Sequence, residues 1–161
     1  MRGSKYHPDV EKLRELLIKV TYEQKLNVLQ HTKSEVACMT ALHVAAYRGH
    51  AEMITTILSS LQSSDRLKLL MMKDFMKHLM IGDDSKCTPL HYAAWASDTE
   101  SVKAILNSLT ADQQMQLLIV EGTAVEMASG ETADVLIRYS MNAIRETRKG
   151  KSMICHPLIL C

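Results

Sequence analysis

Apolar residues recur along the chain in three sets that share one spacing. In each set, four of them stand at i, i+3, i+4 and i+7, which places them on one face of an α-helix, and three more follow after a short polar segment. The sets, offset by 41 and then by 48 residues, are Leu13, Leu16, Leu17, Val20, Leu26, Val28 and Leu29; Ile54, Ile57, Leu58, Leu61, Leu67, Leu69 and Leu70; and Val102, Ile105, Leu106, Leu109, Met115, Leu117 and Leu118. The pattern predicts three similar units, each an amphipathic helix followed by a shorter helical segment.

The shorter segment is expected from about Asp65 to Met72 in the second unit and from about Asp112 to Val120 in the third. Ser64 and Thr110 stand close to the start of these segments. Their side-chain oxygens can accept a hydrogen bond from a backbone N–H that has no partner in the first turn of a helix. Both are therefore predicted N-caps.

A second motif recurs at the offset of 48 residues. Residues 40–46 read Thr-Ala-Leu-His-Val-Ala-Ala, and residues 88–94 read Thr-Pro-Leu-His-Tyr-Ala-Ala. Threonine is favoured at a helix N-cap, and proline suits the first helical position because its fixed φ is already helical. The leucine is expected in the core, and the paired alanines let another helix approach closely. Gly49 is expected to end the first of these helices.

These two motifs, with the Arg-Gly-His of residues 48–50, resemble the ankyrin repeat, and the resemblance extends over roughly residues 9–141. It implies an all-α helical-repeat solenoid of stacked antiparallel helix pairs, with projecting β-turn or hairpin loops. It also implies that the Thr and His of each motif lock the repeat turn through hydrogen bonds. The residues that carry this match are Thr40, His43, Thr88, Pro89 and His91.

The units are longer than ankyrin repeats, which have about 33 residues. The excess lies in the additional helical segment and in loops of unequal length. A third copy of the motif starts at Thr123 but lacks the histidine and is followed by a shorter turn, so we expect a degenerate cap. The predicted divisions are a vector-derived or flexible start (1–8), a partial N-terminal repeat (9–39), two repeats (40–87 and 88–122), the degenerate C-terminal cap (123–141) and a basic, then apolar, tail (142–161).

Composition excludes several classes of protein. The chain has 161 residues, 47% hydrophobic and 23% charged, which is enough apolar material for one core and too much for a disordered segment. Its net charge of +1 removes the whole-chain electrostatic argument for nucleic-acid binding. Apolar runs are far shorter than the roughly 20 residues of a membrane-spanning helix, and neither membrane insertion nor a secretory signal is expected.

Catalytic and cofactor motifs are missing from the sequence. The glycines are too far apart for a phosphate-binding loop, and neither HExxH nor GxSxG is present. Cys87 and His91 are four residues apart and are candidate metal ligands, but the repeat turn already accounts for His91. We expect no enzyme, no cofactor and no metal. Four cysteines without a CxxC pair indicate free thiols, hence a cytoplasmic or nuclear protein.

Candidate binding residues lie beside the repeat turn and in one long loop. In ankyrin-like stacks the inner helices line a groove, and there Tyr47, Arg48, Tyr92 and Trp95 are the residue types that most often carry interface energy, although packing inside the protein is an alternative for Trp95. The loop at residues 73–82 is rich in large apolar side chains. We favour an extension of the preceding helix there, and the alternative is an adaptable contact patch that includes Phe75, Met76, Met80, Asp83 and Asp84.

The function predicted from these features is the binding of a protein partner through the inner-helix groove and the loops. The alternative is a structural or regulatory segment of a larger receptor, channel or enzyme, and a Cys/His enzyme or metal protein is a weaker one. A homodimer through a terminal repeat is also expected to form. The basic residues after Tyr139 are interpreted as a solvated tail, with an arm for nucleic acid or acidic lipid as the alternative.

Overall fold

The computed structural model describes residues 9–31, 39–75, 86–120 and 123–152. The described helices are α1 (Val10–Lys19), α2 (Tyr22–Gln30), α3 (Ala41–Tyr47), α4 (Ala51–Ser59), α5 (Ser63–Leu70), α6 (Pro89–Trp95), α7 (Thr99–Asn107), α8 (Ala111–Val120), α9 (Thr123–Met127) and α10 (Glu131–Ser152). Two short strands, β1 (Asp74–Phe75) and β2 (Lys86–Cys87), complete the described elements.

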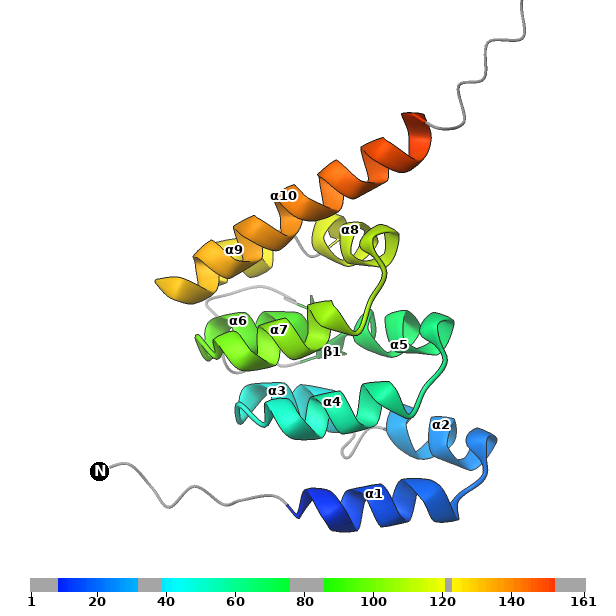
Figure 1. The fold of residues 1–161 in the computed structure, drawn as a ribbon. Coiled ribbons are helices and arrows are strands. Elements are labelled where there is room, and N and C mark those ends of the chain that lie inside the picture. Colours follow the sequence, from blue (N-terminus) through cyan, green and yellow to red (C-terminus); the bar gives the residue numbers. More distant parts are fainter. Residues whose placement is uncertain (1–8, 32–38, 76–85, 121–122, 153–161) are drawn as a thin grey trace, which may run out of the picture.

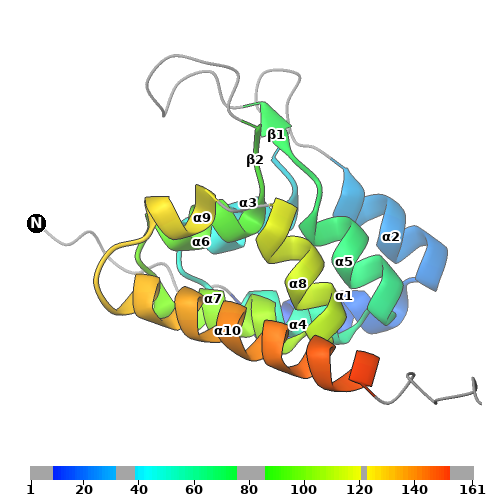
Figure 2. The same ribbon diagram turned by 90° about the horizontal axis from the view of Figure 1, so that it is seen from above.

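The helices are stacked in layers, so that helices at corresponding positions of successive layers lie side by side (Figure 1). An inner column contains α3, α6 and α9, and an outer column contains α1, α4, α7 and α10 (Figure 2). The additional helices α2, α5 and α8 form a third column. The predicted solenoid of helical repeats is confirmed.

The apolar faces predicted for the amphipathic helices, which form the outer column, line the core of the stack. In α4, Ile54 and Leu58 are fully buried, and in α7 Val102, Ile105 and Leu106 are fully buried as well. The first unit follows the pattern less closely, because Leu16 is 54% exposed and Val28 is 67% exposed. The reason is position: α1 and α2 form the first layer, which has a described neighbour on one side only (Figure 1).

Two helices of the third column, α2 and α8, begin with reciprocal caps in which glutamine takes the third helical position. At α2, the Gln24 N–H donates to Thr21 Oγ1 (3.3 Å) and the Thr21 N–H donates to Gln24 Oε1 (3.0 Å). Thr110 and Gln113 repeat this arrangement at α8, which confirms the cap predicted at Thr110. The prediction for Ser64 is wrong, because α5 begins at Ser63, two residues before the expected start at Asp65, and its N-cap is Gln62.

Side chains of the third column also bind the next layer. Lys25 Nζ donates to the Ser60 carbonyl (3.4 Å), and Arg66 Nη1 donates to the Ser108 carbonyl (3.1 Å). Ser60 and Ser108 are the C-caps of α4 and α7, where carbonyl groups have no partner within the helix. A cation on α2 and another on α5 therefore bind the C-terminal end of the outer helix in the following layer and hold the adjacent layers in register.

A tyrosine strengthens the same junction between the first two layers. Tyr22 donates its hydroxyl to Asp65 Oδ2 (2.6 Å) and accepts from the Gln62 N–H (3.0 Å). The hydrogen bond to the Asp65 carboxylate raises the pKa of Tyr22, because that bond is lost when the phenol ionises. The additional helices are thus connected from layer to layer by polar contacts as well as by packing.

The two inner helices that carry the repeated motif end in the same turn. After α3, the Gly49 N–H donates to the Ala46 carbonyl and the His50 N–H to the Ala45 carbonyl, with Gly49 at φ +67° as predicted. After α6, Ser97 takes the place of glycine at φ +52° and makes the corresponding bond to Ala94. A side chain in this left-handed conformation is strained, so Ser97 carries a cost that Gly49 does not.

Exchanging these two residue types should change stability in opposite directions. Ser97→Gly is expected to raise the free energy of unfolding by about 0.5–1 kcal/mol because it removes the strain. Gly49→Ala should lower it by about 1–3 kcal/mol, because a Cβ at Gly49 also meets Asp98 Oδ2 at 3.2 Å. Urea denaturation of the two variants checks this, and changes of the same sign would contradict it.

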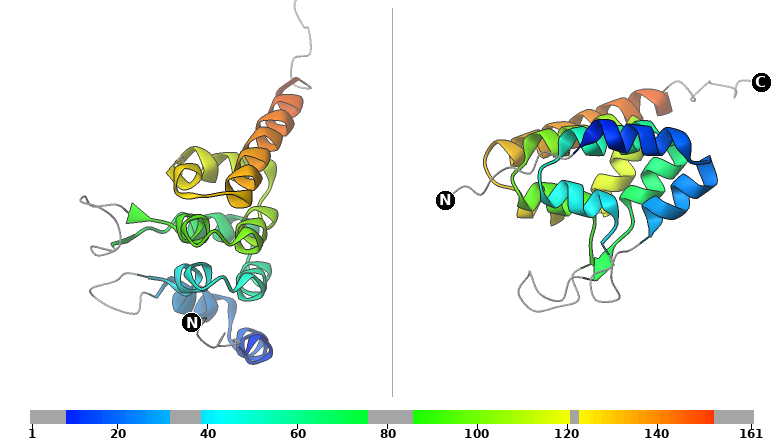
Figure 3. Two further views of the ribbon diagram at one scale, coloured as in Figure 1. Left: turned by 90° about the vertical axis from the view of Figure 1, so that its left-hand side faces the viewer. Right: turned by 90° about the horizontal axis from the view of Figure 1, so that it is seen from below.

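The loop between α5 and α6 starts and ends as a β-hairpin that projects from the stack (Figure 3). Asp74 pairs with Cys87 and Phe75 pairs with Lys86 in an antiparallel register. The favoured prediction, an extension of the preceding helix over residues 73–82, is wrong for Asp74 and Phe75, since α5 ends at Leu70. The backbone partner of these residues lies after the loop, where a local pattern does not reveal it.

The last layer differs from the others in the lengths of its helices. α9 has 5 residues where α3 and α6 have 7, and α10 has 22 residues and continues to Ser152. The tail expected from residue 142 is therefore helical through Ser152. α10 packs through the part that precedes residue 144: the spacing i, i+3, i+4, i+7 recurs at the buried Thr132, Val135 and Leu136 and the partly buried Tyr139, and the buried Ala143 continues this face. Within the described residues, no helix is both long and apolar enough to cross a membrane.

Candidate partner-binding surface

The repeat turn before α3 is closed by a buried threonine and a buried histidine. Thr40 is the N-cap, and its backbone N–H donates to His43 Nδ1 (3.2 Å). The Thr40 hydroxyl lies 2.8 Å from the same nitrogen. Both residues are fully buried, so this local arrangement satisfies polar groups that water cannot reach.

The same histidine connects two layers. Because a backbone N–H can only donate, Nδ1 of His43 is the acceptor and the ring proton is on Nε2. Nε2 then donates to the Cys87 carbonyl (3.2 Å), which directly precedes the next repeat turn. The imidazole thus fixes its own turn through one nitrogen and the start of the following inner helix through the other.

The second turn repeats this geometry. The Thr88 N–H donates to His91 Nδ1 (3.2 Å), the Thr88 hydroxyl lies 3.0 Å from it, and Pro89 occupies the first turn of α6. Thr88 is fully buried and His91 is 4% exposed. The two inner helices therefore start from equivalent, internally bonded turns, and this equivalence brings their outward residues into line.

Four rings from the two inner helices form a continuous row. His43 meets Tyr92 edge-on (ring centroids 5.8 Å apart), and Tyr92 meets Tyr47 edge-on (6.0 Å). Tyr47 and Trp95 are stacked, with centroids 5.7 Å apart and planes 7° from parallel. The row begins in the core and ends on the surface, because Tyr47 is 40% exposed and Trp95 is 42% exposed.

A family model that describes three copies of the ankyrin repeat matches residues 5–117. The chain belongs to the ankyrin-repeat family. None of the curated proteins compared with the chain matches it. Ankyrin repeats are generally protein–protein interaction modules. The match ends within α8, so it covers both repeat turns, whereas α9 and α10 lie beyond it.

Between the ankyrin turns, the inner helices present an outward set of side chains that we call the inner-helix face: Val44, Tyr47, Arg48 and Trp95. Each of them is exposed, Val44 to 37%. They lie on two helices that belong to adjacent repeats, so a partner in contact with this face would touch both. The face combines an aromatic pair, an aliphatic side chain and a cation.

Tyr92, predicted in the same set, lies elsewhere. It is only 6% exposed, since its ring packs between His43 and Tyr47 of the preceding repeat. The residue at the corresponding position of the first motif is Val44, which is exposed. The same motif position is therefore buried in one repeat and exposed in the other. The signal available in the sequence was size: a large ring at this position reaches back over the earlier repeat, and a valine does not.

The loop residues predicted to contact a partner fall mostly outside what the structure describes. Phe75 is placed as the second residue of β1, which positions its backbone at the base of the hairpin. Met76, Met80, Asp83 and Asp84 lie outside the described residues. The described strands β1 and β2 project on the side of the inner column (Figure 2).

Cys87 and His91, the candidate metal ligands, both take part in the hydrogen bonds that fix the repeat turns. Cys87 is buried and its carbonyl accepts from His43, and His91 Nδ1 accepts from the Thr88 N–H. Among the residues of the described ranges, no group of three His, Cys, Asp or Glu side chains is arranged to hold a metal ion. That the protein needs no metal or cofactor stays a prediction.

Proposed function

We propose that this ankyrin-repeat protein binds a protein partner through the inner-helix face and the adjoining hairpin loop, and that it catalyses no reaction. The observation that supports this most directly is the stacked pair of Tyr47 and Trp95, in which two large rings from different repeats remain two-fifths exposed. Aromatic and arginine side chains are the residues that most often dominate binding energy at interfaces.

The pair is well suited to this role because it is already ordered. Tyr47 and Trp95 are the last residues of α3 and α6, and the two turns behind those helices are fixed by Thr40, His43 and Thr88. Stacking further restricts both rings. A partner that covers them would lose less side-chain entropy than one that has to order free side chains.

Arg48 extends the face toward a polar rim. It is the C-cap of α3, directly follows Tyr47 and is exposed. Its guanidinium offers a planar set of donors that suits carboxylates or backbone carbonyls of a partner. Apolar anchors at the centre and a donor at the edge are a common composition for a recognition surface.

The alternative function is a structural or regulatory segment of a larger receptor, channel or enzyme. In that case the stack would only hold neighbouring domains in position, and the inner-helix face would need no specific partner. The reducing location expected from four cysteines without a CxxC pair, cytoplasmic or nuclear, suits both functions.

The test replaces Tyr47, Arg48 and Trp95 together by Ala and compares the proteins captured by each version of the full chain. A matched control replaces Ile18, Lys19 and Val28, which are exposed on the first layer. Partners that depend on the face should be lost by about a hundredfold or more from the first variant only. Helical circular dichroism should stay unchanged in both.

A direct measurement complements the capture experiment. Trp95 is the only tryptophan of the chain, so its fluorescence should shift to shorter wavelength when a captured partner covers it. Equal capture by the wild type and the triple variant, without any change in Trp95 emission, would refute the assignment of this face. No specific partner in any version would favour the structural alternative.

A further inference from the structure

A second exposed surface lies on α10, at the end of the stack remote from α1. Ile137, Met141 and Ile144 are 47%, 66% and 39% exposed, although each is a large apolar side chain. Their spacing, i, i+4 and i+7, places them in one stripe along the helix. The buried face of α10, which includes Leu136 and Ala143, lies beside this stripe and packs against the stack. The stripe is therefore exposed even though the inward face of α10 packs against the core.

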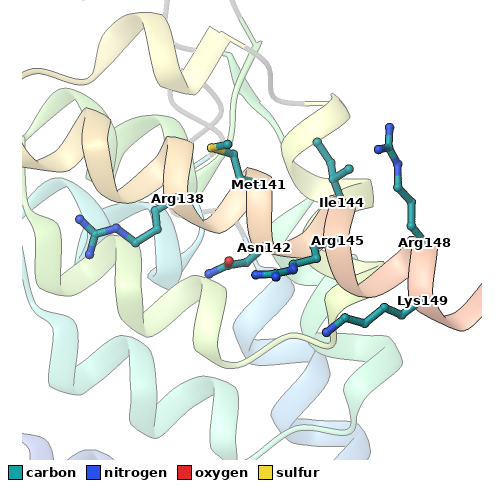
Figure 4. A pocket seen from close by; sticks show the side chains of 7 residues that line it. All are labelled: Arg138, Met141, Asn142, Ile144, Arg145, Arg148 and Lys149. Atoms are coloured by element: carbon teal, nitrogen blue, oxygen red, sulfur yellow. The ribbon is translucent and has the colours of Figure 1, made fainter.

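A parallel stripe one residue further along carries positive charge. Arg138, Arg145 and Lys149, with Asn142 between them, are exposed on the neighbouring side of the helix, and Arg148 follows the apolar stripe. Figure 4 shows that Met141 and Ile144 project to one side of the helix axis and Arg138, Arg145 and Lys149 to the other. Met141, Asn142, Ile144 and the four cations line a shallow depression along the helix. Together with Ile137, they form what we call the α10 surface.

The charge on this surface is largely unbalanced within the described residues. Glu146 pairs with Lys149 (2.8 Å), and this bond lowers the pKa of Glu146. Within the described residues, no carboxylate lies at ion-pair distance from Arg138, Arg145 or Arg148. Three guanidinium groups with free donors thus lie next to three exposed apolar side chains.

We propose that the α10 surface binds an acidic amphipathic helix of a protein partner. Anchors at i, i+4 and i+7 match the apolar side of such a helix packed lengthwise along α10. Its Asp and Glu side chains would meet Arg138, Arg145 and Arg148, whose planar donors suit carboxylates. The apolar contact supplies affinity, and the charges determine which helix is accepted and in which orientation.

Charge decides against a second copy of this chain as the occupant of the α10 surface. Two α10 helices packed on each other would bring Arg138, Arg145 and Arg148 of one copy against the same residues of the other. Like charges at an interface are unfavourable, so the homodimer predicted from the sequence would need another surface. The terminal helix α1 also exposes apolar residues, Leu16 and Ile18, at the opposite end.

The other anionic occupants fit less well. Nucleic acid would use the cations but would leave Ile137, Met141 and Ile144 without a contact. An anionic membrane suits a helix with a broad apolar face, whereas here the inward face of α10 is already occupied by the protein core. A protein helix can contact the apolar stripe and the basic stripe at once.

The α10 surface belongs to the outer column, whereas the inner-helix face lies on the inner column with the hairpin (Figure 2), so the two proposed interfaces are independent.

The test selects binders of the full chain from a displayed library of helical peptides. Enriched peptides should carry Asp and Glu next to an i, i+4, i+7 apolar stripe. Arg145→Glu should weaken their binding by about tenfold or more, and Glu→Lys exchanges in the peptide should restore binding to that variant. Met141→Ser should weaken binding similarly, whereas Lys68→Glu and Ile18→Ser, on other exposed helices, should not.

Several results would overturn the proposal. Enrichment of neutral or basic peptides, or binding that is indifferent to both Arg145→Glu and Met141→Ser, would exclude an acidic helix as the occupant. Vesicles of phosphatidylserine and phosphatidylcholine, and double-stranded DNA, are tested in parallel. Binding to either that Arg145→Glu abolishes, without enrichment of acidic peptides, would assign the surface to lipid or nucleic acid instead. Failure of the inner-helix variants leaves this result unchanged, because they alter a different column.

Discussion

The variant His43→Ala is expected to lose about 3–5 kcal/mol of the free energy of unfolding. The imidazole accepts from the buried Thr40 N–H through one nitrogen and donates to the Cys87 carbonyl through the other. Its removal takes the recorded acceptor from the buried Thr40 N–H and the imidazole donor from the Cys87 carbonyl, and a buried polar group that loses its partner costs about 1–3 kcal/mol. A cavity in place of a fully buried side chain adds to this loss.

The control for this variant is His31→Ala. His31 is exposed at the end of α2, where its backbone rather than its ring makes the recorded hydrogen bond to Val28. The control should change stability by less than about 0.5 kcal/mol. Urea denaturation followed by circular dichroism measures both, and a His43→Ala protein that is already unfolded without urea also supports the prediction. Similar small losses in both variants would show that the bond between repeats contributes little.

The second large effect is expected for Leu136→Ala, at about 2–5 kcal/mol. Leu136 is fully buried on α10, a helix that lies beyond the residues matched by the family model. Its side chain belongs to the same core as Leu106 of α7 and Leu117 of α8. In a stack where each layer contacts only its neighbours, stability depends on such contacts between layers.

The adjacent residue provides the matched control. Ile137 is 47% exposed, so Ile137→Ala removes a similar volume from the surface and should cost less than about 1 kcal/mol. A single cooperative transition, shifted only by Leu136→Ala, would show that α10 folds together with the repeats. A change confined to a separate, early transition would contradict this and make α10 an independent appendage. The same pair separates the structural side of α10 from the side proposed to bind.

The Leu136 and Ile137 variants compare the two sides of α10. One side covers the core, and the other is exposed, so large apolar residues on the exposed side have no packing role within the described residues. Leu136 lies on the side that covers the core. Ile137, Met141 and Ile144 lie on the exposed side, and this is why the α10 surface is proposed as a binding site.

What could be read from the chain alone was local or periodic. The spacing of Ile54, Ile57 and Leu58 states which side of a helix must be buried, whatever covers it. The Thr40–His43 turn closes within four residues, and Gly49 ends its helix through the conformation of its own backbone. Such features depend on neighbours in sequence, so they are visible in sequence.

What the structure alone decided depends on groups that are distant along the chain. Cys87 accepts from His43, Arg66 closes the end of α7, and the pairing of Asp74 with Cys87 makes a hairpin where a helix was favoured. Tyr92 has the same place in its motif as Val44, yet one is buried and the other open, because only the ring reaches the preceding repeat. The repeat pattern determined the kind of layer that this chain builds. The contacts between layers, which cover one residue and leave its equivalent open to a partner, arise only when the layers are stacked.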